Sequence, residues 1–271
     1  MSNATISLPQ VCRPYLSSAA RTLTALLLMG AVFSAGAADI DTYKVDAFAQ
    51  SATNCTTTNL SDPSALKSRL HQSATRATIE CQLTELKRFQ DATVLSTLTK
   101  PQAARQQYLV YKAQAWLNYA TYENSIKSHT AAGNHALQSA DIILQALKNS
   151  SSQTLDLSPD IPDSSALMRP DLWAVLIALK DKNGIEQAPR ELAFSEVALV
   201  WAAADYCEHG ARQSGANFRM ANRWLEQARE AYVNAHDSEA NVALENLTNG
   251  YYKQYALIDS NNNSCRSYRF T

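Results

Sequence analysis

Apolar residues recur every three or four positions along most of the chain after residue 60. In residues 100–127, Leu109, Trp116 and Ala120 fall on one helical face. The same spacing predicts further helices over residues 61–98 (one long or two shorter), 135–149, 169–182, 188–210, 217–236 and 238–259. The pattern therefore favours an all-α fold.

Segments rich in proline, glycine, serine and asparagine separate these periodic runs. Pro63 and Pro101 stand where a first helical turn tolerates proline, and Gly210 follows a run as a helix stop. Residues 149–168 form the longest irregular segment, which makes it the best candidate for a domain boundary. The expected organisation is an irregular lead-in over 38–60, a helical-repeat domain over 61–260 with possible halves 61–150 and 165–260, and an irregular tail over 261–271.

Two helix pairs share a spacing of tryptophan and alanine. Trp116 precedes Ala136 by the same interval as Trp201 precedes Ala221, and the two copies align without a gap. A small residue lets neighbouring helices approach closely, and a large one fills the space between hairpins. We interpret the match as a packing unit used twice. It predicts stacked antiparallel helical hairpins in a degenerate tetratricopeptide-like repeat.

The first 37 residues have the pattern of a secretory signal peptide. Arg13 and Arg21 precede an apolar run over residues 22–33, and a small-residue site ends at Ala37. The run is shorter than the roughly 20 residues that a membrane-spanning helix needs. We therefore expect cleavage after Ala37, a periplasmic location, and no transmembrane span once the leader is removed.

The charge balance argues against polyanionic partners. The whole chain has a formal net charge of −1. Losing the leader would remove two arginines and no acidic residue, which leaves a net charge of about −3. Such a chain has no basic surplus with which to bind nucleic acid or an anionic membrane.

Motifs of common catalytic sites are not found in the sequence. Cys207, Glu208 and His209 are adjacent, but successive side chains on a helix point about 100° apart, so thiol and imidazole do not face each other. We expect no catalytic residue and no cofactor. An enzyme of unrecognised type that uses Glu208, His209 and nearby tyrosines stays open as an alternative.

One loose group of possible metal ligands surrounds a predicted turn. His129 and His135 flank the turn, with Glu123 and Asp141 nearby in the sequence. A solvated turn is the alternative interpretation, because no two histidines share a helix face at ligand spacing. We expect no metal site.

Four cysteines follow the predicted leader, an even number that is typical of disulfides in an exported chain. Of the three possible pairings we favour Cys55–Cys81 and Cys207–Cys265. The second bridge would tie the irregular tail to the end of the Trp201 helix. The first requires the helix after residue 61 to break, or the lead-in to run extended beside it.

Three stretches resemble a known family. "KAQAWLNYATYE" (112–123), "RPDLWAVLIALK" (169–180) and "ELAFSEVALVWAAADY" (191–206) look like the helical N-terminal region of Gram-negative OmpA-family envelope proteins. The resemblance covers residues 100–235 and implies an envelope location with an interaction role, and association with the outer membrane stays open. The sequence shows no counterpart of that family's peptidoglycan-binding domain, so peptidoglycan binding is not implied.

These patterns together predict a non-enzymatic periplasmic protein that acts as a scaffold or adaptor for another envelope protein. Besides the enzyme alternative, the helical hairpins could hold a small ligand between them. The scaffold and the ligand carrier differ in the structural feature that each requires. A scaffold would offer a groove or flank of the stacked hairpins to its partner, whereas a carrier would use an apolar cavity between hairpins.

Overall fold

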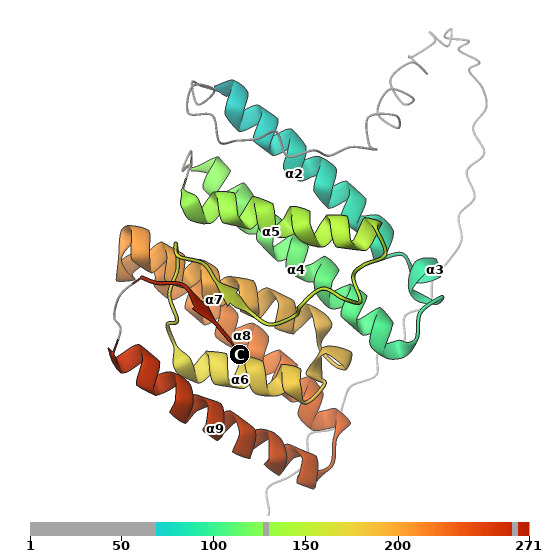
Figure 1. Cartoon of the computed structure of the whole chain (residues 1–271), viewed down its shortest axis with the longest axis vertical. Helices are drawn as coiled ribbons and strands as arrows, with labels where there is room; N and C mark the ends of the chain where they lie inside the picture. Colours follow the sequence, from blue (N-terminus) through green and yellow to red (C-terminus); the bar gives the residue numbers. More distant parts are fainter. Residues whose placement is uncertain (1–68, 127–129, 262–264, 271) are drawn as a thin grey trace, which may run out of the picture. The chain divides into compact units, whose positions relative to one another are not determined.

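The computed structural model describes residues 69–126, 130–261 and 265–270, and these residues are mostly helical (Figure 1). The predicted all-α class is confirmed. The helices are α2 (Arg69–Phe89), α3 (Ala92–Leu95), α4 (Lys100–Ser125), α5 (Ala131–Lys148), α6 (Pro170–Asp181), the 3-10 turn η2 (Gly184–Glu186), α7 (Pro189–His209), α8 (Ala211–Ala235) and α9 (Ser238–Asn261). The predicted leader (1–37), the lead-in (38–60) and residues 61–68 lie outside the described residues.

Local sequence signals explain where several helices begin and end. Gln102 accepts a hydrogen bond from the backbone N–H of Thr99 (3.1 Å), which caps α4 just before Pro101. α5 begins at Ala131, four residues earlier than predicted, because the Thr130 hydroxyl accepts a hydrogen bond from the N–H of Gly133 (2.9 Å). α7 ends before Gly210, whose φ of 80° a residue with a side chain rarely adopts.

Gly133, which the sequence suggested belonged to a turn, lies inside α5 and sets how closely that helix approaches α4. A Cβ atom at Gly133 would lie 3.1 Å from the Cβ of Glu123 on α4. The residue therefore allows close helix packing, as small residues at helix contacts do. α8 likewise starts earlier than predicted, at Ala211.

Two helical hairpins form the centre of the fold. α4 packs on α5, α7 packs on α8, and α4 and α7 join the two pairs. α2 packs on the α4–α5 pair, and α6 and α9 pack together beside α8, an order that Figure 1 also shows. Most of the buried apolar side chains belong to one continuous core, with Leu117 and Leu199 among its fully buried members.

The repeat-packing residues have unequal surroundings. Ala136 and Ala221 are fully buried and Trp116 is nearly so, whereas Trp201 is half-buried. The ring of Trp201 stacks on Tyr119 of the other hairpin, with ring centroids 4.6 Å apart. Both copies are thus helical hairpins with the predicted alanines in the core, and the tetratricopeptide-like relation between them stays a prediction.

The segment between α5 and α6 does not separate two domains. All described residues belong to one compact unit, so the possible halves 61–150 and 165–260 are not independent units. Within the segment, Ile161 is fully buried and the hydroxyl of Ser165 donates a hydrogen bond to the carbonyl of Val200 on α7 (2.8 Å). The segment is long because it crosses the core surface and packs there.

The tail is not irregular throughout, as the sequence had suggested. β2 (Tyr268–Arg269) pairs antiparallel with β1 (Asp160–Ile161), with Asp160 opposite Arg269 and Ile161 opposite Tyr268. Tyr268 and Phe270 also pack against the core. A ladder of two residue pairs leaves no recognisable alternation in the sequence, and only tertiary contact specifies it.

Candidate functional site

A buried charged cluster joins three helices beneath the segment between α5 and α6. Glu196 of α7 is 2% exposed. One of its carboxylate oxygens lies 2.6 Å from the Nζ of Lys112 on α4, and the other lies 2.7 Å from the Nζ of Lys180 on α6. The hydroxyl of Tyr108, also on α4, donates a hydrogen bond to Glu196 and accepts one from Lys180 (2.9 Å). One carboxylate thus fixes the positions of α4, α6 and α7.

Burial and charge act in opposite directions on these groups. Burial alone would raise the pKa of Glu196, but Lys112 and Lys180 outweigh it and hold that pKa at about 2. Burial lowers the pKa of Lys180 to about 8, although Glu196 opposes this shift. Burial and the neighbouring carboxylate raise the pKa of Tyr108 well above its ordinary value. The cluster is therefore an ionised carboxylate between ammonium groups at neutral pH, with a neutral phenol beside it.

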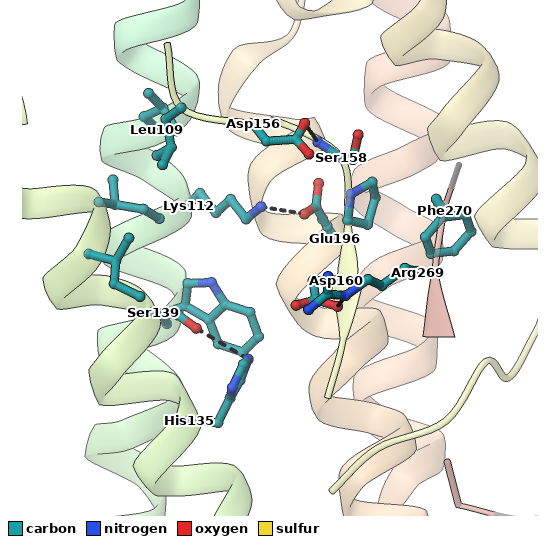
Figure 2. Close-up of a pocket in the computed structure, with 15 residues that line it drawn as sticks. Leu109, Lys112, His135, Ser139, Asp156, Ser158, Asp160, Glu196, Arg269 and Phe270 are labelled. Carbon is teal, nitrogen blue, oxygen red and sulfur yellow. Dashed lines mark hydrogen bonds and ion pairs between the residues drawn. The ribbon is translucent and has the colours of Figure 1, made fainter. Parts of the chain in front are cut away.

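A first cavity of about 370 Å³ lies on one side of this cluster, and Figure 2 shows its labelled walls. α4 and α5 form one wall, and Glu196, the segment after α5 and the chain's last described residues form the other. Its lining comprises Leu109, Lys112, Trp116, His135, Ser139, Ile142, Ile143, Leu155, Asp156, Ser158, Pro159, Asp160, Glu196, Arg269 and Phe270. The volume is within the range of small-molecule sites, which join an apolar lining to a few polar groups.

The cations of the first cavity already have carboxylate partners. Lys112 is paired with Glu196, and the guanidinium of Arg269 lies 3.6 Å from the carboxylate of Asp160. The two cations and three carboxylates that line the cavity carry a formal net charge of −1, which Lys180 offsets from the other side of Glu196. A cavity with paired charges suits a ligand without net charge, because a net-charged one would lose hydration and gain no counter-ion.

His135 adds a neutral hydrogen-bonding group to this cavity. Its Nε2 is 3.2 Å from the hydroxyl of Ser139, and its ring meets the Trp116 ring edge to face at 5.4 Å. Burial lowers the pKa of His135, so the imidazole is uncharged near pH 7. In Figure 2, His135 and Lys112 face Arg269 and Phe270 across the cavity.

A second cavity of about 490 Å³ lies on the other side of the strap, as we name residues 155–159. Strap residues and Phe270 line both cavities. Two cations hold the strap by its backbone: Lys180 donates to the carbonyl of Leu157, and Arg105 donates to that of Leu155. Arg105 also donates to the carbonyl of Ser152, just before the strap (3.0 Å). The strap is therefore fixed to α4 and α6, and it forms a common wall of the two cavities.

A second group of acids lies near the ends of α4 and α7. Asp205 is buried and accepts a hydrogen bond from the amide of Asn217 on α8 (2.6 Å). Burial raises the pKa of Asp205 to about 6, and the charge of Glu123 adds to this shift. Glu123 is itself buried and accepts a hydrogen bond from Thr130 (2.8 Å). These contacts join the hairpins and their turn.

The predicted Cys207–Cys265 disulfide is present, with Cα atoms 5.8 Å apart. It rules out a thiol role for Cys207 in the oxidised protein. Cys81 is disulfide-bonded as well. Its predicted partner, Cys55, lies outside the described residues, so that pairing stays a prediction.

Other residues that the sequence singled out do not come together. Glu208 and His209 are exposed, and neither lines the two cavities. Asp141 accepts a hydrogen bond from Gln82 of α2 (3.2 Å), while His135 faces the first cavity. His129 lies outside the described residues. Within the part of the chain that the structure describes, no group of three or more potential ligands could hold a metal ion.

Sequence reasoning missed Lys112, Lys180 and Glu196, although a signal was present. Glu196 stands inside the mostly apolar run "AFSEVALV" and Lys112 inside "YLVYKAQAWL", whereas Lys180 follows directly on the apolar run "LWAVLIAL". A buried charge needs a partner. The identity of that partner could not be read from the sequence, because the three residues belong to three different helices.

Two further searches, for helices among the described residues that could cross a membrane and for similar known proteins, found none. Over the described ranges, no helix combines the length and apolar character that crossing a bilayer requires. No protein-family model, curated protein or solved structure matches the chain.

Proposed function

We propose that this protein is a non-enzymatic periplasmic binding protein that holds a small, uncharged or zwitterionic, partly apolar molecule in the first cavity. The observation that carries the proposal is the cavity itself, whose lining combines apolar side chains with paired charges and a neutral imidazole. Sites of this kind orient a ligand through a few fixed polar groups. Non-enzymatic binding is part of the proposal because Lys112 and Glu196 neutralise each other.

The periplasmic location has separate support. The leader pattern over residues 1–37 favours export, and disulfides such as Cys207–Cys265 persist mainly in oxidising compartments. N-terminal sequencing of the mature protein should begin at Ala38. A mature chain that begins at Met1 and is recovered from the cytoplasm would contradict this part of the proposal.

An adaptor function has weaker support from the described surface. It would require a coherent apolar face. The large apolar side chains that are exposed are instead spread over several helices: Val94, Tyr122, Ile126, Ile142, Val233, Val242, Tyr252 and Leu257. The first cavity therefore supports ligand binding better than a docking role.

Saturation-transfer NMR with a matched set of probes tests the proposal. N-acetylphenylalanine amide is a neutral probe, and the corresponding free carboxylate and primary amine carry one charge each. We expect saturation transfer to the neutral probe and weaker transfer to both charged analogues. Equal binding of all three probes, or binding of none at millimolar concentration, would contradict the proposal.

A pair of serine variants locates the binding. Ser139 lines the first cavity, whereas Ser238 is exposed at the start of α9. Ser139→Trp should fill the cavity and abolish transfer to the neutral probe. Ser238→Trp, the same substitution outside the cavity, should leave it unchanged.

A further inference from the structure

We propose that the Cys207–Cys265 disulfide controls the first cavity by holding the tail segment, residues 265–270, in place as one of its walls. The inference rests on the proposed function and concerns the regulation of that site. With the disulfide formed the wall is closed, and with the disulfide reduced the wall is open while the helices stay folded.

The tail segment contributes directly to the cavity. Arg269 and Phe270 both line it, and Figure 2 shows them opposite Lys112 and His135. Phe270 lines the second cavity too. Displacement of the tail segment would therefore remove one side of the first cavity without moving any helix.

Apart from the disulfide, few contacts hold the tail segment. The β1–β2 ladder has two residue pairs, and an isolated two-stranded ribbon is marginally stable at best. The Arg269–Asp160 ion pair is mostly exposed, with side chains 84% and 57% accessible, and such pairs contribute little. The main remaining anchors are the rings of Tyr268 and Phe270, which both pack against the core. The Phe270 ring is 4.9 Å from that of Trp173 and 5.3 Å from that of Tyr255, and the Tyr268 ring is 6.5 Å from that of Tyr255.

The disulfide connects the tail segment to α7, the helix that carries Glu196 of the charged cluster. Cys207 is on α7, 11 residues after Glu196, so the bridge lies about 16 Å along the helix from the part of the cavity wall that Glu196 forms. Cys265 is exposed, and a dithiol can reach it. Reduction breaks the S–S bond with two electrons and two protons from the dithiol, which yields two thiols and leaves the dithiol as a disulfide.

The helices have their own support. α7 packs along α8 and α4, and Glu196, Leu199 and Ala203 are buried in those contacts. None of these contacts depends on Cys265. Loss of the bridge should therefore free the tail segment before it affects the core.

The experiment uses the full mature chain and the variant Cys207→Ser/Cys265→Ser. A variant is preferable to a reductant because Cys81 is also disulfide-bonded and a reductant would attack both bridges. Diethyl pyrocarbonate is the probe, with modification of His135 in the cavity measured by mass spectrometry. His236, at the end of α8 and outside the cavity lining, is the internal control.

We expect the variant to modify His135 at least about threefold faster than wild type, with unchanged modification of His236 and unchanged helical circular dichroism. Hydrogen exchange of the peptide over residues 158–163 should accelerate as well, because β1 loses its partner. Phe270→Ala, which leaves the disulfide intact but weakens the anchor, should shift both readouts in the same direction by a smaller factor.

Two results would overturn the inference. Unchanged modification of His135 together with unchanged exchange of β1 would mean that the other contacts hold the tail segment. Faster modification of both histidines with a loss of helicity would mean that the bridge holds the fold as a whole. Neither readout requires a ligand, so the failure of every probe to bind would reject the proposed function without changing this result.

Discussion

Glu196 is a single residue on which three helices depend, and its removal should be costly. Glu196→Gln keeps the shape of the side chain but leaves the largely covered ammonium groups of Lys112 and Lys180 without a counter-charge. Breaking a buried pair on one side typically costs about 3–5 kcal/mol. We expect a loss of that size in the free energy of unfolding, measured by urea denaturation at pH 7.

A fully apolar replacement is the control for this prediction. Tyr108→Phe/Lys112→Met/Glu196→Leu/Lys180→Met removes every charged or hydroxyl group of the cluster at once. Such replacements are often neutral or stabilising, so this variant should be more stable than Glu196→Gln. A cost below about 1 kcal/mol for Glu196→Gln would show that the charges are not buried as described.

Asp205 gives a pH-dependent prediction at the same scale. Its folded pKa of about 6 lies above the ordinary value of 3.8, so the folded state retains the proton more strongly between these values. The stabilisation of the folded state by this retained proton is complete below pH 3.8 and is lost as the pH rises through 6. Asp205→Asn carries no titrating group and can still hydrogen-bond Asn217. Relative to wild type, it should gain about 2–3 kcal/mol between pH 3.5 and 7.5.

Urea denaturation of both proteins at the two pH values measures this gain. The comparison between wild type and variant cancels the contribution of other titrating groups, including His135 and Glu196. A stability difference that is the same at pH 3.5 and pH 7.5 would show that Asp205 titrates normally.

At the scale of the helices, the two tryptophans of the predicted repeat should differ in their energetic roles. Trp116 is 4% exposed in the α4–α5 hairpin, whereas Trp201 is half-buried between α7 and α4. Trp116→Ala should cost about 3–5 kcal/mol, and Trp201→Ala about 1–3 kcal/mol because less apolar area is lost. Thermal melts of the two variants test this, and equal losses would favour equivalent repeat positions.

The helices could be predicted from the sequence because their signals are local. The three- and four-residue spacing that places Leu109 and Trp116 on one face is contained within α4 itself. The start of α5 was missed because Gly133 resembles a turn residue, whereas its function is close contact with Glu123. β1 and β2 were missed because each of their two residue pairs joins segments more than 100 residues apart.

At the scale of the whole molecule, the candidate site could be predicted only in part. The disulfide between Cys207 and Cys265 followed from position, since Cys207 lies near the end of a predicted helix and Cys265 in the tail of a chain that is predicted to be exported. The cavity did not, because its walls come from α4, α5, α7, the strap and the tail segment. Only the folded arrangement brings those walls together, and no spacing within one helix encodes it.

The same long-range contacts predict how the protein unfolds. The sequence suggested two halves that meet in residues 149–168, but Glu196 connects α4 of the first half to α6 and α7 of the second. Trp201 stacks on Tyr119 across the same division, and β1 pairs with β2 from the far end of the chain. Neither half can open without exposing charges and rings that the other half covers. We therefore expect one cooperative transition for the whole helical unit.

Single-tryptophan proteins can test this cooperativity in guanidinium chloride. One retains only Trp116 and reports on the first hairpin, and the other retains only Trp224 of α8 and reports on the second. Replacing the other tryptophans with phenylalanine lowers overall stability, so each fluorescence curve is compared with the far-ultraviolet circular dichroism of the same protein. We expect the two curves to coincide in both proteins. The fluorescence midpoint could instead depart from the circular dichroism midpoint, in opposite directions for the two reporters. That result would mean that the halves unfold separately. It would also mean that the Glu196 contacts contribute little to holding the halves together.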